Sequence, residues 1–334
     1  MQHPNAGEHM TVKIVWSTDW HVSDINPAMR IDNYEEAVFD RISQIRTICA
    51  KAGATICLVG GDVFHVKKSS RVRHALVARL IRELQSFPCP VYSIVGNHDI
   101  SHNNLDTLPT KPLGVVFDSG ALKRLTDLTL EEGDVSVRFL GEDFNHQIEL
   151  DAFHQIQKGD EDWLAVAYHG YACKSGTSYP GETTFKYQDL SQLPIDDWFF
   201  GHWHIDQGIE TIEGKHFVNI GSLTRGSLNL ENIDRNPKAV LAVYGKGKRK
   251  LTQIKLRVKP AREIFDLQRK SRVEAEQQKL KSFMEKLRQT SAIADDNAGP
   301  DYETRLKSYT IDKPVLDCVQ RLIHDAETEL AQRS

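Results

Sequence analysis

The fold is decided by the stretch VKIVWSTDWH, residues 12–21, in which an apolar run ends in an aspartate and a histidine. The apolar run is typical of a β-strand. Asp19 and His21 are two residues apart, so an extended backbone points both side chains the same way. The stretch therefore predicts a strand whose far end carries two polar side chains suited to sharing one metal ion.

Four further motifs follow short β-like runs in the same way. They are Gly60-Gly61-Asp62, Gly96-Asn97-His98-Asp99, His169-Gly170 and Gly201-His202-Trp203-His204. Apolar residues at helical spacing over residues 33–52 and 71–86 predict helices that alternate with the early strands. Open α/β sheets place ligands beyond the carboxyl ends of their strands, so we expect all five motifs to meet at one rim.

The motifs supply carboxylates, imidazoles and an amide, but no thiolate. Two metals roughly 3.5 to 4 Å apart can clamp the attacking and leaving oxygens of a displacement at phosphorus, and a carboxylate is their natural bridge. Asp62 is the candidate bridge. The donor set suits Mn, Fe or Zn better than a soft metal. Each motif alone has an ordinary explanation, such as a turn for Gly-Gly-Asp, whereas five in order predict a phosphoester site.

Residues 11–245 resemble the calcineurin-like metallophosphoesterases, because all five motifs occur in that superfamily's order. The resemblance implies an α/β fold, a four-layer αββα sandwich with metals at the sheet rim. It implies that one metal is held by Asp19, His21, Asp62 and His204, and the other by Asp62, Asn97, His169 and His202. It also implies that His98 faces the scissile phosphate as general acid or transition-state stabiliser. Asp99 would orient His98, or alternatively form an Asx turn or helix cap.

A narrower resemblance, to the nuclease subunits of SbcC-SbcD complexes and their phage relatives, comes from residues 60–70. That group carries a histidine three residues after the bridging aspartate, where this chain has His65. The histidine is implicated in positioning or catalysis; the alternative is a cap on the following helix. The resemblance implies a DNA exonuclease or endonuclease in repair, recombination or phage-related DNA processing. It further implies an SMC-like coiled-coil ATPase partner, and pairing of two copies into a homodimer.

A basic segment directly follows this motif. Its cations are Lys67, Lys68, Arg71, Arg73, Arg79 and Arg82, with no acidic residue between them. Such a segment suits a phosphate backbone, although a charge run is usually a solvated helix face. The predicted substrate contacts are Lys67, Lys68, Arg71 and Arg225. For Arg225 a structural salt bridge is the alternative. The formal net charge of −4 shows that the chain is not globally basic.

The predicted organisation has three parts. Residues 1–11 are a polar extension, residues 12–255 form the phosphoesterase domain, and residues 256–334 form a small α+β cap-like or partner-binding domain. The last part is expected to contain a long helix over 262–290, a strand over 306–311 and a helix over 314–331. It is short for both capping DNA and docking an ATPase, and we favour a reduced cap.

Composition and cysteine usage complete the expectations. The five cysteines are odd in number and scattered, which fits a reducing cytoplasm, and no signal peptide or membrane segment is expected. The expected cofactors are two divalent metal ions, Mn²⁺ first, with Fe²⁺, Zn²⁺ or Mg²⁺ as alternatives. Two other functions stay open, namely a small-molecule phosphomonoesterase or cyclic-nucleotide phosphodiesterase, and a scaffold subunit of an ATPase complex. A shallow open site favours DNA, and a closed pocket favours a small ester.

Overall fold

The computed structural model describes residues 10–65, 71–174, 182–228 and 230–269, together with residues 279 and 282. The chain divides into two compact units, Met1–Phe265 and Asp266–Ser334. Residues 1–9 and nearly all of the second unit lie outside the described residues. So do most of the helix predicted over 262–290, the strand over 306–311 and the final helix.

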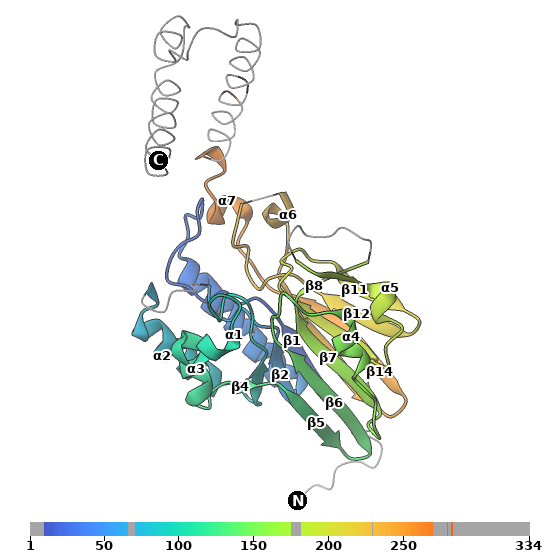
Figure 1. Cartoon of the computed structure of the whole chain (residues 1–334). Coiled ribbons are helices and arrows are strands. Elements are labelled where there is room, and N and C mark those ends of the chain that lie inside the picture. Colours follow the sequence, from blue (N-terminus) through green and yellow to red (C-terminus); the bar gives the residue numbers. More distant parts are fainter. Residues whose placement is uncertain are drawn as a thin grey trace, which may run out of the picture. The chain divides into compact units, whose positions relative to one another are not determined.

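Two six-stranded sheets form the centre of the first unit (Figure 1). The strands of the first sheet are β14 (Lys248–Lys255), β13 (Lys238–Gly245), β1 (Val12–Ser17), β2 (Ile56–Val59), β3 (Val91–Ser93) and β4 (Lys123–Arg124), in that spatial order. Those of the second are β11 (Gly208–Ile212), β12 (Lys215–Asn219), β10 (Asp197–Gly201), β7 (Trp163–His169), β6 (Val135–Glu142) and β5 (Asp127–Glu132).

Side-chain alternation along the strands explains why the sheets stack. In β1, Ile14 and Trp16 enter the apolar core between the sheets, while Val15 faces the opposite side. In β10, Phe199 enters the same inner core, while Trp198 and Phe200 belong to a separate core on the outer face. Successive side chains of a strand point to opposite faces, so strands that are apolar on both faces must be covered on both.

Helices cover the outer faces, as the predicted four-layer sandwich requires. The elements over the first sheet are α1 (Tyr34–Ala52), α2 (His74–Gln85), a 3₁₀ helix (Leu105–Thr110) and α3 (Pro112–Asp118). Those over the second are α4 (Leu150–His154), α5 (Tyr187–Leu190) and the small pair β8 (Tyr171–Cys173) and β9 (Thr184–Lys186). In Figure 1 the two sets lie on opposite sides of the sheets. The fold class is confirmed, and no helix among the described residues is long and apolar enough to cross a bilayer.

The sequence predicted a domain boundary after residue 255, at the end of β14. The first unit continues beyond that point, to Phe265. Leu256 and Phe265 are buried, and the backbone of Arg257 exchanges two hydrogen bonds with the Gln44 side chain of α1. The short helix α7 (Ala261–Ile264) also lies in this stretch. Residues 256–265 therefore pack against the core of the first unit.

The strands that carry the motifs run so that their carboxyl ends meet. In the first sheet β1 is parallel to β2, and β2 is parallel to β3. In the second sheet β7 is parallel to β10. Asp19, Asp62 and Asn97 follow strands β1, β2 and β3 of the first sheet. In the second sheet His169 ends β7 and His202 follows β10. The sandwich therefore gathers the five motifs at one rim.

Candidate metal centre

Four of the predicted ligands occupy an unusual backbone conformation. Positive φ angles occur at Asp19 (51°), His21 (47°), Asp62 (48°) and His202 (83°). Such a conformation costs an ordinary residue about 1–3 kcal/mol and persists only where the surrounding structure enforces it. The strained turns follow directly after strands, so the sheets fix these side chains at the rim.

The motif glycines allow the loops to approach one another closely. A Cβ at Gly96 would lie 2.1 Å from Oδ1 of Asp62, and one at Gly61 would lie 2.5 Å from Nδ1 of His169. Gly61 also has a positive φ of 83°. Any side chain at either position would displace a predicted ligand, which explains the glycines beside Asp62 and Asn97.

The first predicted ligand set forms one compact group, Asp19, His21, Asp62 and His204. The Nε2 atoms of His21 and His204 lie 2.8 Å apart. His204 Nε2 lies 3.5 Å from Asp19 Oδ1, and His21 Nε2 lies 3.7 Å from Asp62 Oδ2. Two imidazole nitrogens and two carboxylates that converge in this way are a donor set that fits a divalent metal.

The second set forms an adjoining group of Asp62, His169 and His202, with Asn97 beside them. His169 Nε2 lies 3.5 Å from Asp62 Oδ1, and Asn97 Oδ1 lies 3.0 Å from His202 Nδ1 and 3.3 Å from His169 Nε2. The two oxygens of Asp62 thus face different groups. This is the geometry expected of a carboxylate that bridges two metals.

Two hydrogen bonds outside these groups orient the second set. Nδ1 of His169 donates a hydrogen bond to the Gly60 carbonyl at 2.6 Å, so the lone pair that can bind a metal is on Nε2. Nε2 of His202 contacts the Glu182 carboxylate at 2.8 Å, which leaves Nδ1 facing Asn97. Such partners fix the tautomer and raise the basicity of a ligating histidine. Glu182 was not among the predicted residues, because nothing in its local sequence links it to His202.

Burial sets the protonation of the histidines. It lowers the pKa of His169 to about 3, and, together with the charge of His204, lowers that of His21 well below its usual value. Both imidazoles are therefore neutral at neutral pH, the form that binds metals.

The two carboxyl groups respond in opposite directions. Burial and the charge of Asp19 raise the pKa of Asp62 to about 7. Burial opposes ionisation of Asp19 as well, but the hydrogen bond and charge of His204 hold the pKa of Asp19 below its usual range. Asp62 is thus the group that most needs a neighbouring cation.

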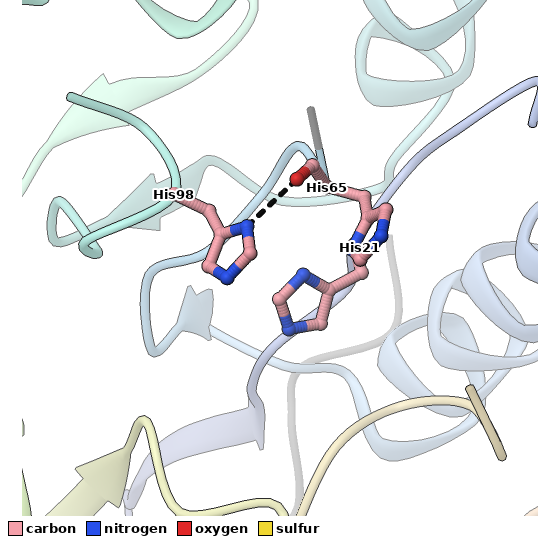
Figure 2. Close-up of side chains that lie close together, drawn as sticks. All are labelled: His21, His65 and His98. Carbon is pink, nitrogen blue, oxygen red and sulfur yellow. Dashed lines mark hydrogen bonds between the residues drawn. The ribbon is translucent and has the colours of Figure 1, made fainter. Parts of the chain in front are cut away.

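A third cluster, of His21, His65 and His98, adjoins the first ligand group (Figure 2). Nδ1 of His98 donates to the backbone carbonyl of His65 at 2.7 Å, and the rings of His65 and His98 stack with centroids 5.4 Å apart. The His21 ring meets His98 edge-on at 4.9 Å. The structure therefore places both predicted catalytic histidines beside a predicted metal ligand.

Residues 12–206 match the calcineurin-like phosphoesterase family, and all but one of the five motifs end well inside this range. The chain belongs to that family. All seven predicted ligands fall within the matched residues. A calcineurin-like phosphoesterase is a metal-dependent hydrolase that binds two divalent metals, and both ligand groups fit that requirement.

The solved structures that match this phosphoesterase share little of its sequence. A protein from Thermus thermophilus is 10% identical with a TM-score of 0.46, covering 74% of this chain and 100% of its own. A dimetal phosphatase from Danio rerio is 10% identical with a TM-score of 0.45, covering 73% and 98%. An archaeal phosphodiesterase is 12% identical with a TM-score of 0.35, covering 73% and 100%. None of the curated proteins matches the sequence significantly.

Asp99, which was predicted to orient His98, makes hydrogen bonds to the backbone of two neighbouring loops. Its carboxylate is buried and accepts hydrogen bonds from the backbone N–H groups of Val63, Phe64 and Gly96, at 3.2, 3.1 and 3.0 Å. It therefore ties the Asp62 loop to the Gly96 loop. His98 is oriented instead by the His65 carbonyl, and local sequence could not reveal that contact.

Arg225 is also structural in this fold, rather than the predicted phosphate contact. Its side chain is buried, and its guanidinium donates to the backbone carbonyls of Ile233 and Lys259. Both are carbonyl contacts, so the alternative of a salt bridge does not describe them either. The residue holds the turn after β12 against the stretch that follows β14.

The basic segment is partly neutralised by acidic residues from elsewhere in the sequence. Arg73 pairs with Asp24 and Glu35. Arg79 pairs with Glu35 and Glu36 of α1 at 2.8 and 2.6 Å. Arg71 and Arg82 are exposed, whereas the predicted contacts Lys67 and Lys68 lie outside the described residues. In the described part of the segment, residues 71–82, these ion pairs interrupt the positively charged surface.

Proposed function

We propose that this phosphoesterase is a two-metal phosphodiesterase that cleaves DNA. The carrying observation is the His65–His98 pair, which stacks beside His21 at the edge of the first ligand group. A phosphodiester has a poor alkoxide leaving group, so a proton donor next to the metals is valuable. His65 also stands where the nuclease group carries its additional histidine.

The chain's own residues have distinct tasks in this proposal. When bound, the two metals supply Lewis acidity toward the phosphate oxygens and a water of lowered pKa. His98, held through Nδ1 by the His65 carbonyl, would act as the imidazolium, giving the proton on Nε2 to the leaving oxygen and remaining as the neutral ring. His65 restricts the His98 ring by stacking against it. Asp62 would hold both metals, one through each oxygen, and Glu182 fixes the ring of His202.

A small nucleotide phosphodiester is the second candidate substrate. It is favoured by the ion pairs of Arg73 and Arg79, which reduce the charge available to a DNA backbone. It is also favoured by a cavity of about 390 Å³ beside the first ligand group, a volume at the lower end of small-molecule sites. DNA and a small nucleotide ester share the same cleavage chemistry.

The deciding experiment is a cleavage assay with Mn²⁺ on end-labelled single- and double-stranded DNA, a chromogenic phosphodiester and a phosphomonoester. Asp62→Ala is the inactive reference, and Asp151→Ala, on exposed α4, is the matched control. Metal-dependent DNA cleavage lost only in Asp62→Ala supports the proposal. Cleavage of small esters alone moves the function to the second candidate. If no substrate is cleaved, both candidate functions are contradicted for the isolated chain, and a scaffold role remains.

The division between ligands and catalytic histidines has its own test. His98→Ala is expected to lose cleavage about 100-fold or more while keeping both metals, because the residue serves the transition state. His65→Ala is expected to lose less, because the carbonyl that orients His98 remains. Metal content by elemental analysis accompanies the rates. Loss of bound metal in either variant would show that these histidines are ligands.

The remaining expectations concern partners and location. We propose an SMC-like ATPase partner, and self-association through the helices of the core. Size-exclusion chromatography with light scattering, alone and with a candidate ATPase, tests both. The cytoplasmic location and the choice of Mn²⁺ stay predictions.

A further inference from the structure

The cavity of about 390 Å³ opens directly from the first ligand group. Its inner wall is formed by His21, His65 and His204, which belong to the candidate active centre. Its outer walls come from the loop after β1, represented by Ala28, and from the turn after β12, represented by Gly226. A substituent on a phosphate bound at the metals would therefore enter this cavity.

The outer walls are neutral. Pro27, Ala28 and Ile205 give an apolar surface, and Ile205 is 41% exposed. The remaining lining is hydroxyl and amide, and Tyr34 and Thr224 hydrogen-bond each other through their hydroxyls at 3.0 Å. Among the described residues, no lysine, arginine, aspartate or glutamate lines this cavity.

The nearby cations support the walls from behind rather than facing the cavity. Arg235 is buried and donates to the carbonyls of Ser222 and Thr224 at 2.7 and 2.6 Å. Arg30 is buried and pairs with Asp32 at 2.7 Å. The neutral wall is thus held in place by guanidinium groups that are already engaged. Among the described residues, no lysine or arginine side chain lines the cavity to contact a second phosphate.

We propose that this cavity binds a single nucleoside attached to the scissile phosphate, so that the substrate is a nucleotide phosphodiester with a terminal nucleoside. The inference rests on the proposed phosphodiesterase function and narrows it. An apolar face with hydroxyl and amide groups suits a base and sugar, and the volume suits one such unit. A strand that continued through the cavity would place its next phosphate against a neutral wall. Cleavage is therefore confined to chain ends.

Gly226 provides a way to fill the cavity without disturbing the fold. A Cβ at this position meets no atom within 4 Å, and its φ lies outside the left-handed region. Gly226 does not belong to either ligand group. Gly226→Trp should occupy the cavity, and Gly226→Ala is the matched control that leaves it open.

The test compares two chromogenic phosphodiesters that release the same p-nitrophenolate. Thymidine 5′-p-nitrophenyl phosphate carries a nucleoside, and methyl p-nitrophenyl phosphate does not. In Gly226→Trp, kcat/KM for the nucleoside ester should fall by about tenfold or more, because the pocket for the nucleoside is filled. For the methyl ester, kcat/KM should stay as in wild type. Gly226→Ala should behave as wild type. Equal effects on both esters, or no effect on either, would overturn the inference.

Two further measurements separate this inference from the proposed function. Thymidine binding to the metal-free protein, followed by ligand-observed NMR, should be present in wild type and Gly226→Ala and absent in Gly226→Trp. Failure to bind overturns the cavity assignment even if DNA is cleaved. Circular single-stranded DNA should resist cleavage while its linear form releases mononucleotides, and cutting of the circle would overturn the restriction to ends. If wild type cleaves no phosphodiester at all, it is the proposed function that has failed.

Discussion

The two ligand groups that share Asp62 differ in how the protein holds them. In the second group the side chains of His169 and His202 are 0% and 7% exposed, and each ring is fixed by an outer partner. In the first group the His204 side chain is 47% exposed and borders the cavity together with His21. The histidines of the second group are thus buried, whereas the first group has one exposed ligand, His204, at the cavity.

This difference assigns separate tasks to the two groups. A buried, pre-oriented set of donors keeps its geometry without a ligand and should bind its metal more tightly. The open set has room for the substrate and lies beside His98, which serves the leaving group. The variants below either remove the common element of the two groups or change one group alone.

The largest effect is expected from Asp62→Asn, which weakens both groups at once. The amide cannot bridge two cations through negative oxygens, so metal content should fall from two to less than one per chain. Activity should fall about a thousandfold or more. Elemental analysis and cleavage rates check this. Retention of two metals would show that the bridge lies elsewhere.

An effect confined to the second group is expected from Glu182→Ala. Removing the partner of His202 Nε2 should lower the affinity for one metal about 10- to 100-fold and leave the other unchanged. Glu182→Gln, which keeps a hydrogen-bonding oxygen, should restore most of the affinity. Two-site calorimetric titration distinguishes the sites. Equal weakening of both, or no rescue by glutamine, would contradict a positioning role.

A pH effect follows from the pKa of Asp62, which is raised from 3.8 to about 7 in the metal-free protein. Folded Asp62 holds a proton between these values that the unfolded chain has lost. Metal-free stability should therefore fall as pH rises from about 4 to 7. Metal must displace this proton, so its affinity should drop up to about tenfold per pH unit below 7. Melting curves should show a larger Mn²⁺-induced gain in Tm at about pH 8 than at about pH 5.5. A gain independent of pH would argue against Asp62 as a ligand.

The smallest effect is expected from Arg79→Gln, outside both groups. Arg79 is engaged by Glu35 and Glu36 and stacks over the Phe39 ring, so it is not available to DNA. Stability should change by no more than about 1 kcal/mol, as is usual for exposed pairs. The salt dependence of DNA binding should stay as in wild type. A slope reduced by about one would restore this arginine as a phosphate contact.

Strands, helices and the motif residues at the strand ends are encoded by short-range patterns, so they could be predicted from the sequence. Apolar runs that end in Asp, Asn and His predicted strands whose motifs gather at one rim, and the resemblance of those motifs to a known family implied the two-sheet fold. The sequence could not predict contacts made across the fold. Glu182 meets His202, Asp99 joins two loops, and Arg79 meets α1, each through packing that has no local signature. The positive φ angles at Asp19 and Asp62 are likewise imposed by tertiary structure.

The most direct test of the central claim is a crystal structure of the protein soaked in Mn²⁺, with an anomalous difference map at the rim. The account predicts two peaks roughly 3.5 to 4 Å apart, one on each side of Asp62, with the peak beside His169 and His202 the more fully occupied. A single peak, or a peak held by His21, His65 and His98 in place of the first ligand group, would contradict it.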